Sequence, residues 1–207
     1  MIHSTLHTAG AHLLIWEVAE TEAELISLLS NFDTYKLEFE QLKTTKRKLE
    51  FLATRVALNT LTESEISVEY SPEGKPFCAN TNLHISISHS AKWIAVITHP
   101  SNVVGIDIEI PTDKFQKLYQ RFLNKNEQKV LFDANDLRKV QLAWSAKEAL
   151  YKIIGNEAVN FDKQLEVMDF SLDNDVSFKG IHTVMGKEYT LYYSTNKAFN
   201  LVYCVDS

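Results

Sequence analysis

Residues 103–111 constrain this chain more than any other part of its sequence. They are rich in β-branched side chains and end in a proline, which is typical of a buried strand. Side chains alternate between the two faces of a strand, so Gly105, Asp107 and Glu109 share one face and only apolar residues occupy the other. The sheet that contains this strand must therefore place two carboxylates side by side. Gly105 would leave open space beside them, where a ligand could approach.

Two interpretations of these carboxylates are open. They can protect an edge strand against aggregation, as charged residues often do. Alternatively they belong to a site, because solvent exposure alone is an unusual reason for two acids on an otherwise apolar strand. A second acidic segment further along the chain bears on this choice.

Residues 137–154 are predicted to form a helix, with Asp136 as the N-cap and Gly155 as the stop. Most of the helix circumference is apolar, and a narrow polar sector contains Gln141, Ser145, Glu148 and Lys152. Glu148 and Lys152 can form a simple surface pair, worth about 0.3 kcal/mol. A helix this apolar is buried on most sides, however, which favours a polar sector that faces a cleft. Lys147 falls in the apolar part and needs an anionic partner or a route to solvent.

The strand and the helix together offer the carboxylates of Asp107, Glu109 and Glu148 and the ammonium group of Lys152. Hard oxygen ligands are those that Mg²⁺ prefers, and a nearby cation helps to neutralise phosphate groups. These four residues therefore predict a magnesium ion that holds a pyrophosphate.

Residues 83–97 are predicted to form a β-hairpin whose turn carries Ser88, His89 and Ser90. Hydroxyls, an imidazole and turn N–H groups suit the binding of a phosphate. The same residues also make an ordinary polar turn, so both interpretations stay open.

The hairpin has a weak repeat near the C-terminus. Residues 191–203 align with residues 85–97 without a gap, and a predicted helix precedes each segment. We therefore predict an α+β chain of two related halves packed face to face, with a cleft between them. His89 is present in only one copy, so the scaffold itself does not demand it.

The chain resembles the 4′-phosphopantetheinyl transferases, specifically the larger, monomeric, two-lobed type that activates surfactin synthetase. The matching motifs occur in the family's order within residues 45–155. They are Gly74-Lys75-Pro76, Ile87-Ser88-His89-Ser90, Gly105-Ile106-Asp107-Ile108-Glu109, residues 122–127 and residues 144–152. The last two acidic motifs together are specific for the family, whereas the Ser-His-Ser motif alone is a weak indication.

The resemblance implies an enzyme that moves the phosphopantetheine arm of coenzyme A onto a serine of an apo acyl or peptidyl carrier protein, as in fatty acid biosynthesis. The other product would be 3′,5′-ADP. It implies a monomer of two pseudo-symmetric α+β lobes, each a helix packed on a small antiparallel sheet, with the active site in the cleft between them. Residues 1–102 would form the N-terminal lobe with the coenzyme A nucleotide contacts, and residues 103–207 the C-terminal lobe with the metal site. Mg²⁺ is the expected metal, with Mn²⁺ as the alternative.

By the same resemblance, Asp107, Glu109 and Glu148 would hold the metal on the pyrophosphate, and Lys152 would stabilise charge on the phosphate that transfers or leaves. Glu127 or Glu148 would take the proton from the carrier serine, directly or through water on the metal. Glu127 has a second explanation, because it completes a good capping box with the asparagine three residues before it.

At the nucleotide end of coenzyme A, the resemblance assigns Ser88 and His89 to the 3′-phosphate and its neighbourhood. Lys75 and Pro76 would contact the nucleotide.

Residues 36–61 are predicted to form one charged helix. A run of charges usually marks a solvated helix face. Arg47 is the cation in this stretch that we expect to reach the 3′-phosphate.

The chain departs from the family in two places. Ala91 stands where a glycine commonly follows Ser-His-Ser, which predicts a slightly different turn. Residues 156–161 replace the usual glycine-rich continuation of the second helix. Neither change touches the acids predicted to bind the metal. We therefore expect the two changes to affect the geometry of the phosphopantetheine arm or the preference for a carrier.

Composition agrees with this interpretation. A chain of 207 residues, 45% of them hydrophobic, can bury a core as one domain or two small lobes. The 27 acidic against 21 basic residues give a net charge of −6, which opposes general nucleic-acid binding.

Cys78 and Cys204 lie far apart and fit a reducing cytosol. We see neither an N-terminal signal nor an apolar run near the ~20 residues that span a membrane, and therefore expect a cytoplasmic protein.

Two other functions remain open. A metal-dependent nuclease also uses acids and a lysine, but its usual arrangement places them two apart on a strand, whereas Glu148 and Lys152 are four apart on a helix. The second alternative is a non-catalytic homologue that binds coenzyme A or a carrier. Loss of a metal-binding acid would indicate that homologue, and all three are present. The sequence does not distinguish fatty-acid, polyketide and peptide carriers.

Overall fold

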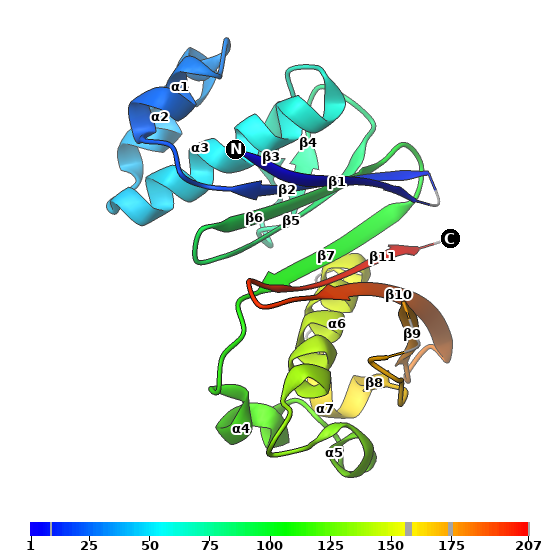
Figure 1. The fold of residues 1–207 in the computed structure, drawn as a ribbon. Coiled ribbons are helices and arrows are strands. Elements are labelled where there is room, and N and C mark those ends of the chain that lie inside the picture. Colours follow the sequence, from blue (N-terminus) through cyan, green and yellow to red (C-terminus); the bar gives the residue numbers. More distant parts are fainter. Residues whose placement is uncertain (9, 156–158, 174–175, 207) are drawn as a thin grey trace. The chain divides into compact units, whose positions relative to one another are not determined.

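The computed structural model describes residues 1–8, 10–155, 159–173 and 176–206. It divides the chain into two compact units, an N-terminal unit (Met1–Ser101) and a C-terminal unit (Asn102–Ser207). Each unit combines helices with antiparallel strands, so the predicted α+β class is confirmed (Figure 1). The packing of the two lobes and the cleft between them stay predictions.

The N-terminal unit contains one four-stranded sheet with a long helix on it. The strand order is β1 (Ile2–Thr8), β2 (Ala11–Glu17), β6 (Trp93–His99) and β5 (His84–Ser90). Its other elements are α1 (Glu22–Ser27), α2 (Phe32–Gln41), α3 (Thr45–Thr62), β3 (Val68–Tyr70) and β4 (Pro76–Cys78). Helix α3 packs on β2 and β6, and the core between them includes Leu14, Leu52, Val56, Ile94 and Val96.

The C-terminal unit repeats this plan with a five-stranded sheet. The strand order is β7 (Val103–Glu109), β11 (Asn200–Asp206), β10 (Lys187–Thr195), β9 (Ser177–His182) and β8 (Leu165–Val167). Its helices are α4 (Phe115–Leu118), the 3-10 helix η1 (Tyr119–Arg121), α5 (Lys125–Leu131), α6 (Arg138–Ile154) and α7 (Phe161–Gln164). Helix α6 packs on β7 and β11, and the core here includes Val140, Ala146, Leu150, Leu191 and Val202.

The predicted helices need two corrections. The stretch predicted as one helix over residues 36–61 is broken, because Leu42 is extended and Thr44 caps a new helix by accepting the N–H of Arg47 at 3.2 Å. The N-cap of α6 is Leu137 rather than Asp136, whose carboxylate instead accepts the N–H of Arg138 at 3.1 Å. Of the segment 156–161, residues 156–158 lie outside the described residues, and the last residue begins α7. In the described ranges, no helix combines the length and the apolar character that crossing a bilayer requires.

The β5–β6 hairpin is present, but Ser88, His89 and Ser90 belong to strand β5 and not to the turn. Because neighbouring strand residues point to opposite faces, Ser88 and His89 do not share a face. The turn consists of Ala91 and Lys92. Ala91 has a φ of 53°, as at the first turn position of a type II′ hairpin, where glycine is preferred.

The two units repeat one arrangement of strand, helix and hairpin. Strand β2 precedes α3 and pairs with β6, and strand β7 precedes α6 and pairs with β11. The two hairpins have the same register, since Ile87 pairs with Val96 and Tyr193 pairs with Val202. This register agrees with the gapless alignment predicted from the sequence.

The repeat identifies acids that the scaffold does not require. Asp107 pairs with Val202 of β11, and Leu14 pairs with the matching residue of β6, Val96, so Asp107 corresponds to Leu14. By the same register, Glu109 corresponds to Trp16. The N-terminal unit thus builds the same strand with apolar residues at both positions. The carboxylates need another explanation than the fold.

Candidate active site

A glycine allows α6 to approach β7 closely. A Cβ atom added at Gly105 would lie 2.1 Å from the carbonyl oxygen of Ala149 and 3.0 Å from Cγ1 of Ile153. The space that we expected beside the carboxylates is therefore filled by the helix, and the predicted ligand approach at Gly105 is wrong. The close approach has a different consequence, which is that side chains of α6 reach the acids of β7.

The two acids of β7 contact residues of α6. Lys152 Nζ donates to Asp107 Oδ1 at 3.2 Å and to the carbonyl oxygen of Ile106 at 2.6 Å. The indole N–H of Trp144 donates to Glu109 Oε1 at 3.3 Å. Strand β7 is an edge strand of its sheet, but Asp107 is only 6% exposed, so protection of a solvent-facing edge does not explain it.

Glu148 completes an electrostatically coupled group of carboxylates. Its pKa is raised to about 7, first by burial and then by the negative charges of Asp107 and Glu109, while Lys152 opposes the shift. Glu148 is thus electrostatically coupled to Asp107 and to Glu109, the two other acids that the sequence predicts as metal ligands. At neutral pH, Glu148 is poised between its two protonation states.

The chemistry of this donor set fits a hard divalent cation, because all three groups offer carboxylate oxygens and repel one another without one. Within the described ranges, no three Asp, Glu, His or Cys side chains already stand in a metal-binding arrangement. The contacts of the acids account for this, since Asp107 is directed to Lys152, and Glu109 to Trp144 and to Lys114 Nζ at 3.6 Å. Metal binding would require these side chains to turn away from their present partners.

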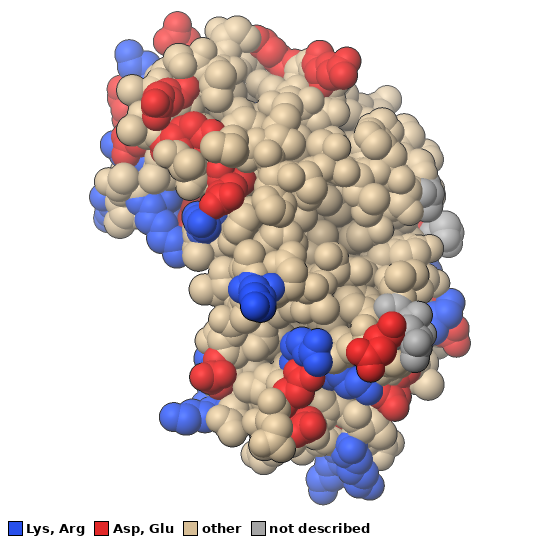
Figure 2. Space-filling model, in the orientation of Figure 1, with Lys and Arg blue, Asp and Glu red and all other residues tan. Residues whose placement is uncertain are grey.

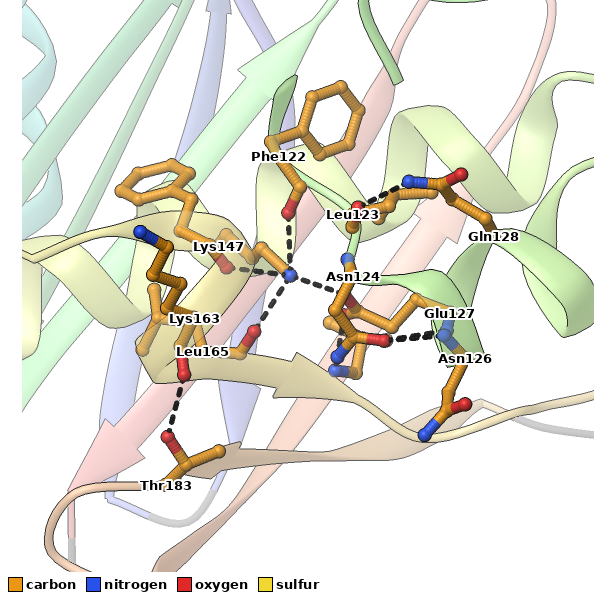
Figure 3. A network of polar contacts seen from close by, with 12 residues as sticks. Phe122, Leu123, Asn124, Asn126, Glu127, Gln128, Lys147, Lys163, Leu165 and Thr183 are labelled. Carbon is orange, nitrogen blue, oxygen red and sulfur yellow. Dashed lines mark hydrogen bonds and ion pairs between the residues drawn. The ribbon is translucent and has the colours of Figure 1, made fainter. Parts of the chain in front are cut away.

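Lys147 and Glu127 belong to a buried polar network in the same unit (Figure 3). Lys147 is 0% exposed, and its Nζ donates to Glu127 Oε2 at 2.7 Å. The same ammonium donates to the carbonyl oxygens of Phe122, Phe161 and Leu165 at 2.8, 2.9 and 2.7 Å. Burial lowers the pKa of Lys147 and raises that of Glu127, and the attraction between the two charges opposes both shifts. Lys147 thus finds an anionic partner instead of reaching solvent.

Glu127 also performs the capping predicted from the sequence. Its Oε2 accepts the N–H of Asn124 at 2.7 Å, and the Asn124 side chain accepts the N–H of Glu127 at 2.9 Å. Its Oε1 accepts the N–H of Val167 at 2.8 Å, which joins α5 to β8. Both oxygens of this 1%-exposed side chain are therefore engaged. The contacts favour a structural role for Glu127 over the role of a base.

In the N-terminal unit, a buried acid brings two of the predicted nucleotide ligands together. Glu50 of α3 lies 3.1 Å from Nη1 of Arg47 and 3.4 Å from Nδ1 of His89. Ser88 is 8% exposed and belongs to the other face of β5. Ser88 and His89 therefore point to opposite faces of β5, and Arg47 and His89 share the contact with Glu50.

Lys75 and Pro76 stand at the β3–β4 hairpin. The N–H of Ser71 donates to the carbonyl oxygen of Lys75 at 2.9 Å, and Pro76 begins β4, which packs beside β5. Half-burial lowers the pKa of Lys75. The described contacts thus place Lys75 on a hairpin next to β5, separate from the Glu50 contacts.

Three residues with evident roles were not assigned from the sequence. Trp144 and Lys114 contact Glu109, and Glu50 joins Arg47 to His89. The indole N–H of a buried tryptophan needs an acceptor, which was a usable signal for Trp144. Glu50 gave only the weaker signal of its helical spacing from Arg47.

Charged side chains on the face in view occur in separate basic and acidic groups (Figure 2). Such a mixed distribution differs from the continuous basic surface that is typical of nucleic-acid-binding proteins.

The match to a family model concerns the C-terminal half of the chain. Residues 103–204 match the family model of the 4′-phosphopantetheinyl transferase superfamily. The 4′-phosphopantetheinyl transferase AcpT of Salmonella typhi is 30% identical over 118 residues, which cover 54% of this chain and 62% of that protein. AcpT of Salmonella typhimurium is 31% identical over 120 residues, with the same two shares. A phosphopantetheinyl transferase of Thraustochytrium is 27% identical over 150 residues, covering 60% of this chain and 51% of the relative.

The chain therefore spans between half and two thirds of the length of these curated relatives. The matched range begins at the first residue of β7 and contains Asp107, Glu109, Glu148 and Lys152. Through residues 103–204, the chain belongs to the 4′-phosphopantetheinyl transferase superfamily.

Proposed function

We propose that this protein transfers the 4′-phosphopantetheine arm of coenzyme A to a serine of an apo acyl or peptidyl carrier protein. The observation that carries the proposal is the group of coupled carboxylates, in which Asp107 and Glu109 raise the pKa of Glu148 and Lys152 contacts Asp107. Family membership supports the reaction type, and the relatives are named phosphopantetheinyl transferases.

The proposed reaction is a displacement at phosphorus. The serine hydroxyl oxygen forms a bond to the phosphorus that carries the pantetheine arm, and the bond from that phosphorus to the bridging oxygen of the pyrophosphate breaks. The bridging oxygen keeps the electron pair and leaves as part of 3′,5′-ADP. The serine proton passes to a carboxylate of the enzyme.

Asp107, Glu109 and Glu148 would hold a divalent cation, Mg²⁺ or Mn²⁺. When bound, the cation would supply Lewis-acid stabilisation of charge on the pyrophosphate. Lys152 stands next to Asp107 and is 25% exposed, so its ammonium can also reach a phosphate oxygen. Its present partners, the carboxylate of Asp107 and a backbone carbonyl, keep it directed toward the acids.

For the proton transfer we propose Glu148. Without a cation, its pKa is raised to about 7, so it takes up a proton more readily than an ordinary carboxyl, and its side chain is only half-buried. Glu127 is the less suitable candidate, because Lys147 and two backbone N–H groups occupy its oxygens.

The decisive experiment is the intact mass of an apo acyl carrier protein after incubation with this protein, coenzyme A and Mg²⁺. A gain of about 340 Da, the covalent mass of one phosphopantetheine arm, that is lost with EDTA is the expected result for metal-assisted transfer. Apo peptidyl carriers are tested in parallel. Tight binding of coenzyme A without a mass gain on any carrier would contradict the proposal and favour a non-catalytic binding protein.

A further inference from the structure

A buried carboxylate in the N-terminal unit joins a helix terminus to a strand terminus. Glu50 is 6% exposed. Its Oε2 accepts from Nη1 of Arg47 at 3.1 Å, and its Oε1 lies 3.4 Å from Nδ1 of His89 and 3.7 Å from Nζ of Lys46. A carboxylate with so little exposure has lost most of its hydration and depends on such cations. Glu50 thus connects the first turns of α3 to the end of β5.

Helix stability does not explain why these cations are here. The first turn of α3 contains no acidic residue, and Lys46, Arg47 and Lys48 stand at the positive end of the helix dipole, where cations are unfavourable. Both ion pairs within α3 also place the base before the acid, which is the weaker order. The side chains of Lys46 and Arg47 are 71% and 64% exposed. Exposed cations at a helix N-terminus suit an anionic ligand.

We infer that Glu50 is a positioning residue for the anionic group that Arg47 and His89 bind. A carboxylate at ion-pair distance from Nδ1 favours a proton on that nitrogen and a ring that is turned toward the carboxylate. The same carboxylate holds the guanidinium of Arg47 beside the imidazole. Glu50 acts through these two side chains and does not itself touch the ligand.

The identity of the anion rests on the proposed function, under which it is the 3′-phosphate of coenzyme A. An arginine and a histidine that converge on one carboxylate offer the ligand hydrogen-bond donors from two side chains. A nucleotide without the 3′-phosphate would lose these contacts. Glu50 would therefore contribute to the discrimination between coenzyme A and 3′-dephospho-coenzyme A.

The test is calorimetric titration of the full chain with both nucleotides, using Glu50→Gln, Glu50→Asp and a control. Glu38→Gln is the matched control, because Glu38 also pairs with an arginine of α3, Arg55, at 3.1 Å in the same unit. We expect the wild type to prefer coenzyme A and Glu50→Gln to reduce this preference about tenfold, as for outer partners of binding residues. Glu38→Gln should keep the preference, and Glu50→Asp should retain part of it.

A second readout separates positioning from a general loss of stability. Nitrogen-15 NMR of His89 should show the proton on Nδ1 in the wild type and in Glu38→Gln, and a changed tautomer in Glu50→Gln. An unchanged nucleotide preference or an unchanged tautomer in folded Glu50→Gln would overturn the inference and leave the proposed transfer intact. Equal affinity of the wild type for both nucleotides would overturn it as well, and the carrier mass gain would then decide separately whether the transfer stands.

Discussion

Asp107 shows how a single residue departs from what its strand needs for folding. The matching position of the N-terminal unit is Leu14, which belongs to the hydrophobic core of that unit. Placing a carboxylate in such a position requires compensation, and Lys152 supplies it through a contact of 3.2 Å. A residue that is costly for the fold and coupled to two other acids is best explained by chemistry.

We therefore expect Asp107→Asn to reduce transfer at least about 100-fold while the chain still folds, because the amide keeps the shape but removes one negative ligand. The rate is measured by carrier mass and the fold by the urea unfolding midpoint. Asp113→Asn is the control, since Asp113 is an exposed acid near the same strand. Normal turnover by well-folded Asp107→Asn would remove the metal assignment.

Ala91 stores backbone strain in the β5–β6 turn. Its φ of 53° is left-handed, which opposes a Cβ atom by about 1–2 kcal/mol. Ala91→Gly relieves this strain but adds about 0.5–1 kcal/mol of unfolded-state entropy, so we expect a net stabilisation of about 1 kcal/mol. Urea unfolding measures the change. Ala198→Gly, in the β10–β11 turn without a positive φ, should be destabilising, and an equal shift in both variants would contradict the strain.

At the scale of elements, the packing of α6 on β7 depends on the absence of a side chain at Gly105. In Gly105→Ala, the new Cβ would lie 2.1 Å from a helix carbonyl oxygen, so helix and strand must separate. We expect a loss of about 3 kcal/mol in the free energy of unfolding. Gly186→Ala is the comparison, because nothing lies within 4 Å of its Cβ and only its φ of +63° opposes the change. A loss in Gly105→Ala no larger than in Gly186→Ala would show that the packing is loose.

The ion pair of Lys147 and Glu127 joins α5 and α6 in the core of the C-terminal unit. Lys147→Met would leave the Glu127 carboxylate buried without its cation and should destabilise the chain by about 3–5 kcal/mol. The double variant Lys147→Met/Glu127→Gln removes both charges and should recover a large part of this loss. Urea unfolding of these two variants and of Glu127→Gln alone gives the coupling energy, and additive losses would indicate that the pair is not coupled.

How far these elements could be predicted depends on whether their signal is local. The alternation in residues 103–109 and the apolar periodicity of α6 are local patterns. Strand β7 begins where it was predicted and ends before Ile110 and Pro111, and α6 begins at Arg138 and ends, as predicted, at Ile154. The break between α2 and α3 contains no glycine or proline, and its only marker is the cap at Thr44. The β5–β6 turn was misplaced because Ala91, rather than a glycine, occupies the left-handed position.

The contacts within the site were harder to predict, because they join residues far apart in the sequence. The sequence indicated that Lys147 needs an anion and that Glu127 caps a helix, but not that the two meet. It indicated a small residue at Gly105, but not that the backbone of α6 fills the space. Both facts depend on how the helices and strands pack against one another, and a single sequence does not record that packing.

For the whole molecule, the repeated arrangement of strand, helix and hairpin acts as a common scaffold for different chemistry. At the positions matched by register, the C-terminal unit has Asp107 and Glu109 where the N-terminal unit has Leu14 and Trp16. The N-terminal unit has instead the buried Glu50 with its surrounding cations. The two units thus carry different charged groups on one plan of strand, helix and hairpin.

Glu148 should make the stability of the whole chain depend on pH. Its pKa in the folded chain is raised from 4.5 to about 7, so the folded state binds this proton more tightly than the unfolded state. The stabilisation from this proton is complete below about pH 4.5 and is lost as the pH rises through about 7. Glu148→Gln is neutral at every pH and lacks this dependence. As the pH rises from about 5 to about 8, the unfolding free energy of the wild type should therefore decrease relative to that of Glu148→Gln.

A divalent cation should reverse this loss, because it binds the ionised acids of the folded chain and not the unfolded chain. Urea unfolding at about pH 8 should thus show a gain in stability with Mg²⁺ for the wild type, a much smaller gain for Glu148→Gln, and none for either with EDTA. At about pH 5 the gain should shrink, since protons compete with the metal at Glu148. Stability that depends on pH as expected but never on Mg²⁺ would show that the acids are coupled without forming a metal site. Independence from both would contradict the burial of Glu148 among Asp107 and Glu109.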